Sequence, residues 1–220
     1  MKVALSFQYC GTCLPIPTNG YIVSGHQLPF SIRWVVCLFV TENIKDLTTF
    51  YLSQFLGRWY EIERFPTWYE NQGDCAYKTI LLCGRRIEIE HGFVRDEIEY
   101  VLHVNSSYSP GDEAVFEIQA NNVDPIGIPL TVISTDYSNY AIVYGCKNST
   151  FMDVKYLSAW ILSRQQAVSN EILDKARREL GSIPYANVAY LERVVQDDNK
   201  CKHRWTAHVQ AEISDEFGEI

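Results

Sequence analysis

The sequence predicts an all-β protein in which a series of short antiparallel strands is followed by one C-terminal helix. Three observations carry this prediction. Short segments with apolar residues at every second position follow one another between residues 59 and 162, which is the periodicity of half-buried strands. Turn-forming residues separate these segments. Aromatic residues, which favour strands, make up 13% of the chain. The pattern alone is typical of an antiparallel sandwich or of an up-and-down barrel.

The expected strands follow in chain order. In the first, residues 59–65, we expect Glu61 and Glu63 on one face and Tyr60, Ile62 and Arg64 on the other. The same reasoning predicts seven more strands, over residues 75–82, 87–90, 97–104, 114–119, 129–134, 140–146 and 154–162. Turns are expected between them, at Cys83-Gly84, His91-Gly92, residues 109–112 and residues 136–139.

One helix is expected after the strands. Ser169 is a suitable N-cap, Glu171 favours the positive start of a helix, and Gly181 fits the C′ position. An apolar stripe at spacings of three and four is expected to dock on the strands, and it consists of Ile172, Leu173, Ala176 and Leu180. A final strand-like segment is expected over residues 186–195.

Composition excludes several classes of protein. With 19 basic and 27 acidic residues, the chain carries a formal net charge of −8, which argues against a nucleic-acid surface and against attraction to anionic membranes. The apolar segment over residues 34–40 is too short to span a bilayer. Residues 1–50 do not share the strand pattern, and we interpret them as an atypical leader or N-terminal extension, or as a mis-assembled gene start. Residues 203–220 are expected to form a mobile acidic tail.

Three short motifs resemble the signatures of the lipocalin family, in the family's order. Gly57-Arg58-Trp59 resembles the G-x-W motif on the first strand, and Thr135-Asp136-Tyr137 resembles the second signature. Arg164, just after the last strand, resembles the basic residue of the third. Residues 60–66, 69–71 and 159–164 further resemble apolipoprotein D-like lipocalins and the insect bilin-binding lipocalins. The resemblance covers roughly residues 51–202 and implies an eight-stranded antiparallel up-and-down β-barrel with a calyx.

The signature residues are expected to act structurally. The resemblance implies that Trp59 plugs the closed end of the barrel, where Arg164 would lie over its ring as a cation–π contact. Asp136 is expected in a hairpin turn, where its carboxylate can accept backbone N–H bonds. These features specify a fold and do not show that any reaction occurs.

The resemblance also implies two disulfides. It pairs Cys75 with Cys201, and it pairs Cys146 with an N-terminal cysteine, for which Cys13 is the expected residue and Cys10 and Cys37 remain alternatives. The motif from Cys10 to Cys13 lacks the partners of a zinc site and the βαβ context of a redox motif. Disulfides, together with glycosylation sequons at Asn105 and Asn148, predict a secreted extracellular protein.

The expected ligand is a small hydrophobic molecule, which the family implies to be a fatty acid, a sterol or a biliverdin-like pigment. Apart from such a ligand, no cofactor and no metal is expected. Trp160 and Leu162 share strand parity with Arg164 and are expected to face the cavity, with hydroxyls of Tyr156 and Ser158 near its mouth. Strand alignment adds further candidate ligand-binding residues, namely Ile80, Leu130 and Val132.

Catalysis is the less favoured function. The chain contains no G-x-S-x-G, H-E-x-x-H or phosphate-loop motif, and His103 is expected at the surface rather than as a haem ligand. The alternative is a lipid-modifying enzyme with Cys83 as nucleophile, which requires a basic neighbour such as Arg85 or Arg86. A barrel filled by side chains that acts in protein interaction is a third possibility. A receptor or lipoprotein partner cannot be named from the sequence.

Overall fold

The computed structural model of the chain describes residues 50–67, 69–70, 73–84, 86–109, 112–149 and 154–212. The expected leader, the N-terminal cysteines Cys10, Cys13 and Cys37, and the last residues of the acidic tail lie outside these ranges.

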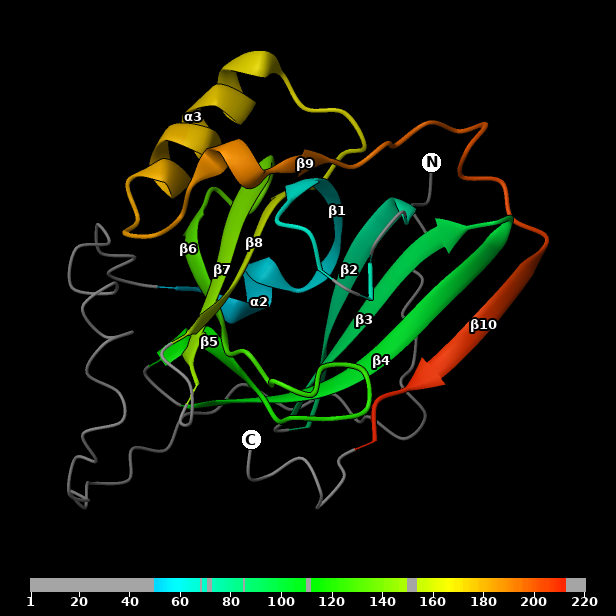
Figure 1. The fold of residues 1–220 in the computed structure, drawn as a ribbon, viewed down its shortest axis with the longest axis horizontal. Coiled ribbons are helices and arrows are strands. Elements are labelled where there is room, and N and C mark those ends of the chain that lie inside the picture. Colours follow the sequence, from blue (N-terminus) through cyan, green and yellow to red (C-terminus); the bar gives the residue numbers. More distant parts are fainter. Residues whose placement is uncertain are drawn as a thin grey trace, which may run out of the picture.

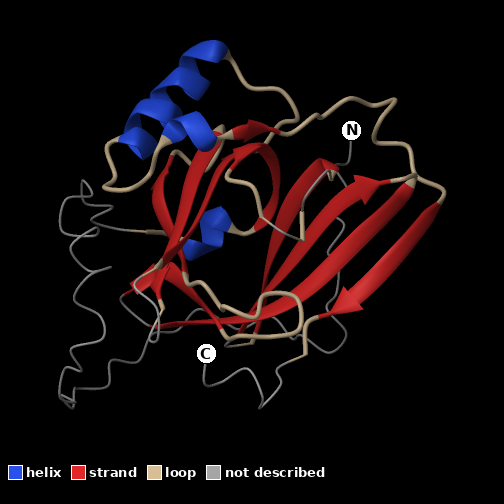
Figure 2. Ribbon diagram, viewed as in Figure 1, coloured by secondary structure: helices blue, strands red, loops and turns tan. Residues whose placement is uncertain are grey.

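Eight antiparallel strands close into a barrel, as predicted (Figure 1, Figure 2). Each strand pairs with the next along the chain, β1 pairs with β8, and the β4–β5 pairing completes the ring. The bounds are β1 Gly57–Arg64, β2 Asp74–Cys83, β3 Arg86–Arg95, β4 Ile98–Ser109, β5 Asp112–Ile118, β6 Leu130–Thr135, β7 Tyr140–Asn148 and β8 Lys155–Ser163.

One predicted turn is wrong. His91 and Gly92 lie inside β3, and the chain reverses instead at Asp96 and Glu97, which both adopt left-handed backbone angles with φ of 54° and 61°. Gly92 is needed for packing, because a Cβ there would lie 2.2 Å from the ring of Tyr77 on β2. The glycine therefore marks a close side-chain approach between neighbouring strands.

Two helices contact the barrel from different sides. The one-turn helix α2 (Leu52–Phe55) places Phe55 in the core inside the barrel. The predicted helix is α3 (Asn170–Gly181), where the side chain of Ser169 accepts the backbone N–H of Ile172 as an N-cap. Its buried face packs against the outside of β7 and β8 (Figure 1) through Leu173, Ala176 and Leu180. No described helix combines the length and the apolar character needed to cross a membrane.

The side-chain pattern of β1 differs from the prediction. A register shift against β8 falls between Glu61 and Glu63, so their side chains do not share one face of the strand. Both side chains are buried, because the barrel interior covers one face of β1 and other parts of the chain, α3 among them, cover the other. Glu61 lies inside the barrel, whereas Glu63 forms an ion pair with Arg177 of α3 outside it. An alternating strand with two covered faces cannot be distinguished by its pattern from a strand with one face in water.

The C-terminal segment returns to the barrel. A 3-10 helix, η2 (Val188–Tyr190), and the two-residue strand β9 (Glu192–Arg193), which pairs with β1, replace the longer strand expected there. The predicted disulfide between Cys75 and Cys201 is present. Beyond it, β10 (Trp205–Gln210) pairs in parallel with β4, so the prediction of a mobile tail is wrong for these six residues.

Candidate ligand-binding site

A cavity of about 660 Å³ lies inside the barrel. Its walls come from β2, β3, β4, β5, β6 and β8, and two loops, β1–β2 and β5–β6, surround it at one end. Most of the lining is apolar, with contributions from Ile89, Leu102, Val104, Ile118, Val123, Pro125, Ile126, Ile128, Leu130, Leu157 and Trp160. This is the size and character of a pocket for one small hydrophobic molecule.

The structure separates the predicted ligand-binding residues into two groups. Trp160 and Leu130 line the cavity, as do Tyr156 and Ser158. Leu162, Ile80 and Val132 face inward as expected, but they are packed in the core around Trp59 and are not among the cavity-lining residues. Strand parity therefore located the inner face, while depth along the barrel axis decides which inner residues reach the cavity.

The closed end of the barrel is an aromatic floor made of Phe50, Phe55, Trp59 and Phe116. The indole N–H of Trp59 donates to the carbonyl oxygen of Phe55 over 2.8 Å. The guanidinium of Arg164 lies 3.8 Å from the centre of the Trp59 ring, which is the predicted cation–π contact.

Hydrogen bonds fix this arginine and the chain beneath it. Arg164 donates to the carbonyl oxygens of Arg58 at 2.9 Å, Gln54 at 2.8 Å and Tyr137 at 3.1 Å. Gly57 of the G-x-W motif adopts a φ of 93°, a left-handed conformation that side chains rarely adopt. The first signature therefore supplies both the plug and the backbone conformation that leads into it.

The second signature forms a capped turn between β6 and β7. Thr135 Oγ1 accepts the backbone N–H of Tyr137, and Asp136 accepts the backbone N–H groups of Ser138, Asn139 and Tyr140. Partial burial opposes ionisation of Asp136, but the hydrogen bonds from the Asn139 side chain and the three amides outweigh it and lower its pKa. The role predicted for Asp136 matches this geometry.

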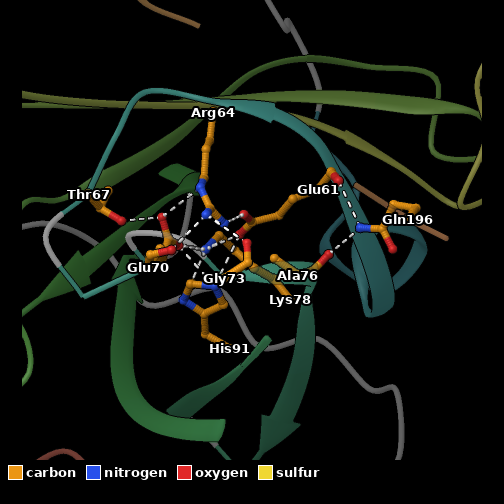
Figure 3. Close-up of polar contacts among 9 residues, drawn as sticks. All are labelled: Glu61, Arg64, Thr67, Glu70, Gly73, Ala76, Lys78, His91 and Gln196. Atoms are coloured by element: carbon orange, nitrogen blue, oxygen red, sulfur yellow. Dashed lines mark hydrogen bonds and ion pairs between the residues drawn. The ribbon is translucent and has the colours of Figure 1, made fainter. Parts of the chain in front are cut away.

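Above the floor lies a buried charged cluster of five side chains, shown in Figure 3: Glu61, Arg64, Glu70, Lys78 and His91. Lys78 Nζ is 2.8 Å from Glu61 Oε1 and 3.3 Å from Glu70 Oε1. Arg64 Nη1 is 3.1 Å from Glu61 Oε2, and its Nη2 donates to two carbonyl oxygens of the β1–β2 loop. Each buried charge thus has an opposite charge within contact distance, as burial requires.

His91 completes the cluster. Its Nε2 lies 2.9 Å from Glu70 Oε1 and 3.3 Å from Glu61 Oε1. Burial and the nearby Lys78 ammonium both disfavour the imidazolium, but the two carboxylates outweigh them and raise the pKa of His91. Burial likewise opposes the charged form of Glu61, yet Lys78, His91 and Arg64 hold its pKa well below the ordinary value. The pKa of Glu70 is also lowered, by Lys78 and His91 against burial and Glu61.

The three acidic and imidazole side chains of this cluster are close enough to hold a metal ion, with ligand atoms of Glu61, Glu70 and His91 all within 4.8 Å of one another. The ammonium of Lys78 already contacts both carboxylates and lies 3.4 Å from His91 Nδ1. It supplies the positive charge that an ion would bring. The arrangement is therefore an internal ion-pair network rather than a metal centre.

The charged cluster also borders the cavity. Lys78 and His91 are lining residues, and Lys78 Nζ lies 4.4 Å from the centre of the Trp160 ring. The sequence prediction did not include these polar residues. The one available signal was a lysine in the middle of an otherwise apolar strand, Cys75–Leu82, which is unusual unless the charge is paired.

The remaining predicted residues lie outside the cavity lining. Cys83 ends β2, and its Sγ donates to Glu88 Oε2 at 3.8 Å. Asn105 is exposed on β4, and Asn148 is half-buried at the end of β7, so glycosylation at both stays a prediction. Cys146 is described on β7, but its expected partner Cys13 is not, and that pairing also stays a prediction.

A closed antiparallel barrel with an apolar cavity, a plugged end and a helix against its outer wall defines the calyx class of binding proteins. The model of the lipocalin / cytosolic fatty-acid binding protein family matches residues 56–198. The chain belongs to this family, as its three motifs predicted.

Individual relatives agree with the predicted branch of the family. Insecticyanin-A from Manduca sexta is 28% identical over 142 residues, covering 60% of this chain and 74% of the relative. Apolipoprotein D from Macaca fascicularis is 30% identical over 154 residues, covering 68% and 77%. The bilin-binding protein of Pieris brassicae is 26% identical over 133 residues, covering 59% and 69%. Among solved structures, insecticyanin from the tobacco hornworm shares the fold, with a TM-score of 0.61 at 23% identity over 74% of this chain and 89% of that one.

Proposed function

We propose that the protein is a secreted extracellular carrier that binds one small hydrophobic ligand non-covalently in its calyx. The observation that carries the proposal is the apolar cavity of about 660 Å³ inside a barrel whose opposite end is plugged by Trp59. Removing apolar surface from water supplies most of the affinity in such a site. The cavity, together with membership of the family, favours a carrier over a filled barrel that acts only in protein interaction.

The ligand class that fits is a fatty acid, a sterol or a biliverdin-like pigment, and the charged cluster favours the acids among them. With His91 protonated, the cluster holds three positive groups, Arg64, Lys78 and His91, against two carboxylates, which leaves one positive charge in excess. Lys78 and His91 border the cavity, where a ligand carboxylate could reach them. A relative named for bilin binding supports the pigment.

Secretion is supported by the disulfide between Cys75 and Cys201, which joins β2 to the C-terminal segment. Such bonds form and persist in oxidising compartments and are rare in the cytosol. The sequons at Asn105 and Asn148 agree with this location.

The proposal includes no catalytic step. Cys83, the nucleophile of the enzymatic alternative, is not among the cavity-lining residues of the described structure, and its thiol donates to the carboxylate of Glu88. Alkylating Cys83 should therefore leave ligand binding intact.

The test is a titration of the purified chain with biliverdin, followed by absorbance, and with a polyene fatty acid whose fluorescence rises in apolar surroundings. Val104→Trp fills part of the cavity and should weaken binding at least about tenfold, since overpacking a pocket excludes its ligand. Val188→Trp, at an exposed site on η2, is the matched control and should bind as the wild type does. Failure of the wild-type chain to bind either compound, or equal binding by Val104→Trp, would refute the carrier function.

A second titration compares the fatty acid with its methyl ester. If Lys78 and His91 receive the carboxylate, the acid should bind more tightly than the ester, and Lys78→Met should remove that difference. Equal affinity of acid and ester for the wild-type protein would show that the charged cluster does not receive a ligand carboxylate.

A further inference from the structure

A second group of metal-ligating side chains lies on the outer wall of the barrel, where β3, β4 and β10 run side by side (Figure 1). It consists of Glu88 and Glu90 on β3, His103 on β4 and His208 on β10. Leu102 and Val104 line the cavity, so the alternation of side chains along β4 turns His103 away from the calyx. This outer histidine site is thus separate from the ligand site.

The two imidazoles face each other through one nitrogen each. His103 Nε2 lies 2.9 Å from His208 Nδ1, so the two rings must either share a proton or direct their lone pairs at a common cation. In tetrahedral zinc coordination, nitrogen atoms bound at about 2.0–2.1 Å lie about 3.3 Å apart. The separation of the two nitrogens is therefore a few tenths of an ångström short of that between two ligands of one zinc ion.

The other nitrogen of His103 has a carboxylate partner. His103 Nδ1 lies 3.1 Å from Glu88 Oε1, a geometry in which Nδ1 carries the proton and Nε2 keeps its lone pair toward His208. A carboxylate that accepts the far N–H of a ligating histidine is the usual support of a protein metal site, because it fixes the tautomer and the ring. Glu88 is thus a positioning residue.

A third ligand is available from the next outward-facing position on β3, two residues after Glu88. Glu90 pairs directly with His103 in the strand register, and ligand atoms of Glu88, Glu90 and His103 all lie within 4.8 Å of one another. The donor set of two imidazoles and a carboxylate suits zinc and neighbouring divalent transition metals.

We propose that this outer site binds a divalent transition metal such as Zn²⁺ through His103, His208 and Glu90, with Glu88 orienting His103. The ion joins β10 to the barrel wall. The disulfide at Cys201 ties the chain just before β10, and reciprocal hydrogen bonds between Asn122 and Glu212 tie it just after. The metal would fasten the middle of the strand, where His208 is exposed.

The test is a calorimetric titration of the full chain with Zn²⁺ at neutral pH. His208→Ala removes one imidazole and should weaken Zn²⁺ binding at least about tenfold, and Glu88→Gln should weaken it about 10–100-fold by freeing His103. His203→Ala is the matched control, because His203 also contacts a carboxylate, Glu99, at 3.4 Å but has no second imidazole beside it among the described residues. This variant should bind Zn²⁺ as the wild type does. Binding that survives His208→Ala unchanged would overturn the proposal.

A second readout locates the ion without relying on affinity. Saturating Zn²⁺ should slow amide hydrogen exchange across Trp205–Gln210 in the wild-type protein and in His203→Ala, and should have no such effect in His208→Ala. Because the variants lie on the outer wall, calyx binding of the fatty acid should be the same in all of them. Zn²⁺ that leaves exchange in β10 unchanged in the wild-type protein would also overturn the site.

Discussion

The aromatic floor and the charged cluster are neighbours inside one barrel, yet they solve the burial problem in opposite ways. At the floor, Trp59 is fully buried, its indole N–H is bonded to a backbone carbonyl, and the guanidinium of Arg164 lies over its ring. In the cluster, five ionisable side chains are removed from water and depend on one another. Packing thus stabilises the floor, whereas attraction between opposite charges stabilises the cluster. A single substitution should therefore change the unfolding free energy by different amounts in the two regions.

The largest effect is expected in the charged cluster, from Glu61→Ala. Glu61 contacts Lys78, Arg64 and His91, and its loss leaves buried cations without their main partner. Breaking a buried ion network in this way costs about 3–5 kcal/mol of unfolding free energy. Urea denaturation followed by far-ultraviolet circular dichroism measures it.

Glu117→Ala is the matched control for that substitution, because Glu117 is exposed on β5. It should change the unfolding free energy by less than about 0.5 kcal/mol. A loss for Glu61→Ala as small as that of the control would mean that the cluster contributes little to stability and that the comparison with the floor fails.

The second effect is expected at the floor, from Trp59→Phe. This change keeps an aromatic plug but removes the N–H that Phe55 accepts and part of the ring surface under Arg164. A lost buried hydrogen bond together with a partly empty site costs about 2–3 kcal/mol. The same denaturation experiment applies, and fatty-acid affinity should be unchanged, because Trp59 does not line the cavity. A large loss of affinity would show that the floor shapes the calyx as well as closing it.

The two regions also differ in how far the sequence predicts them. The floor belongs to motifs with fixed roles, so Trp59, Arg164 and Asp136 could each be assigned from short segments, and the eight strands followed from alternation and turns. The cluster arises from long-range geometry. Alternation in β1 predicts Glu61 on the same face as Glu63, and the turn signal at Gly92 predicts His91 in a turn. Both predictions are wrong, because the register shift in β1 and the length of β3 depend on pairing with neighbouring strands. β10 was missed for the same reason, since its pairing partner β4 lies about a hundred residues earlier.

A third prediction uses pH to distinguish the regions. The pKa of His91 is raised in the folded state, so its imidazolium contributes stability that is fully present below the unfolded value of about 6.5 and is lost as the pH rises through the folded value. Glu61 has a lowered pKa, so its contribution is present above about 4.3 and is lost as the pH falls toward the folded value.

The cluster is therefore expected to be most stabilising between about pH 5 and 6.5. His91→Gln should lower the unfolding free energy there by on the order of 1 kcal/mol, and its difference from the wild type should shrink as the pH rises toward 9. Trp59→Phe serves as the reference, because its difference from the wild type should stay constant over the same range. A pH-independent His91→Gln difference would show that the pKa of His91 is the same in the folded and unfolded states.

The smallest effect is expected from Ser169→Ala, at the N-cap of α3, which lies outside both regions. The substitution removes the acceptor of the Ile172 backbone N–H, and the loss of an N-cap costs about 0.5–2 kcal/mol, with values near 1 being typical. Because α3 packs on the outer wall through Leu173, Ala176 and Leu180, this loss should lower the unfolding free energy at every pH while leaving fatty-acid and Zn²⁺ affinities unchanged. Ser169→Asp, which retains a capping oxygen, should restore stability. If Ser169→Ala weakened ligand binding, the outer helix would be coupled to the calyx through the Arg177–Glu63 ion pair, and floor and cluster could no longer be treated as independent of the surface that surrounds them.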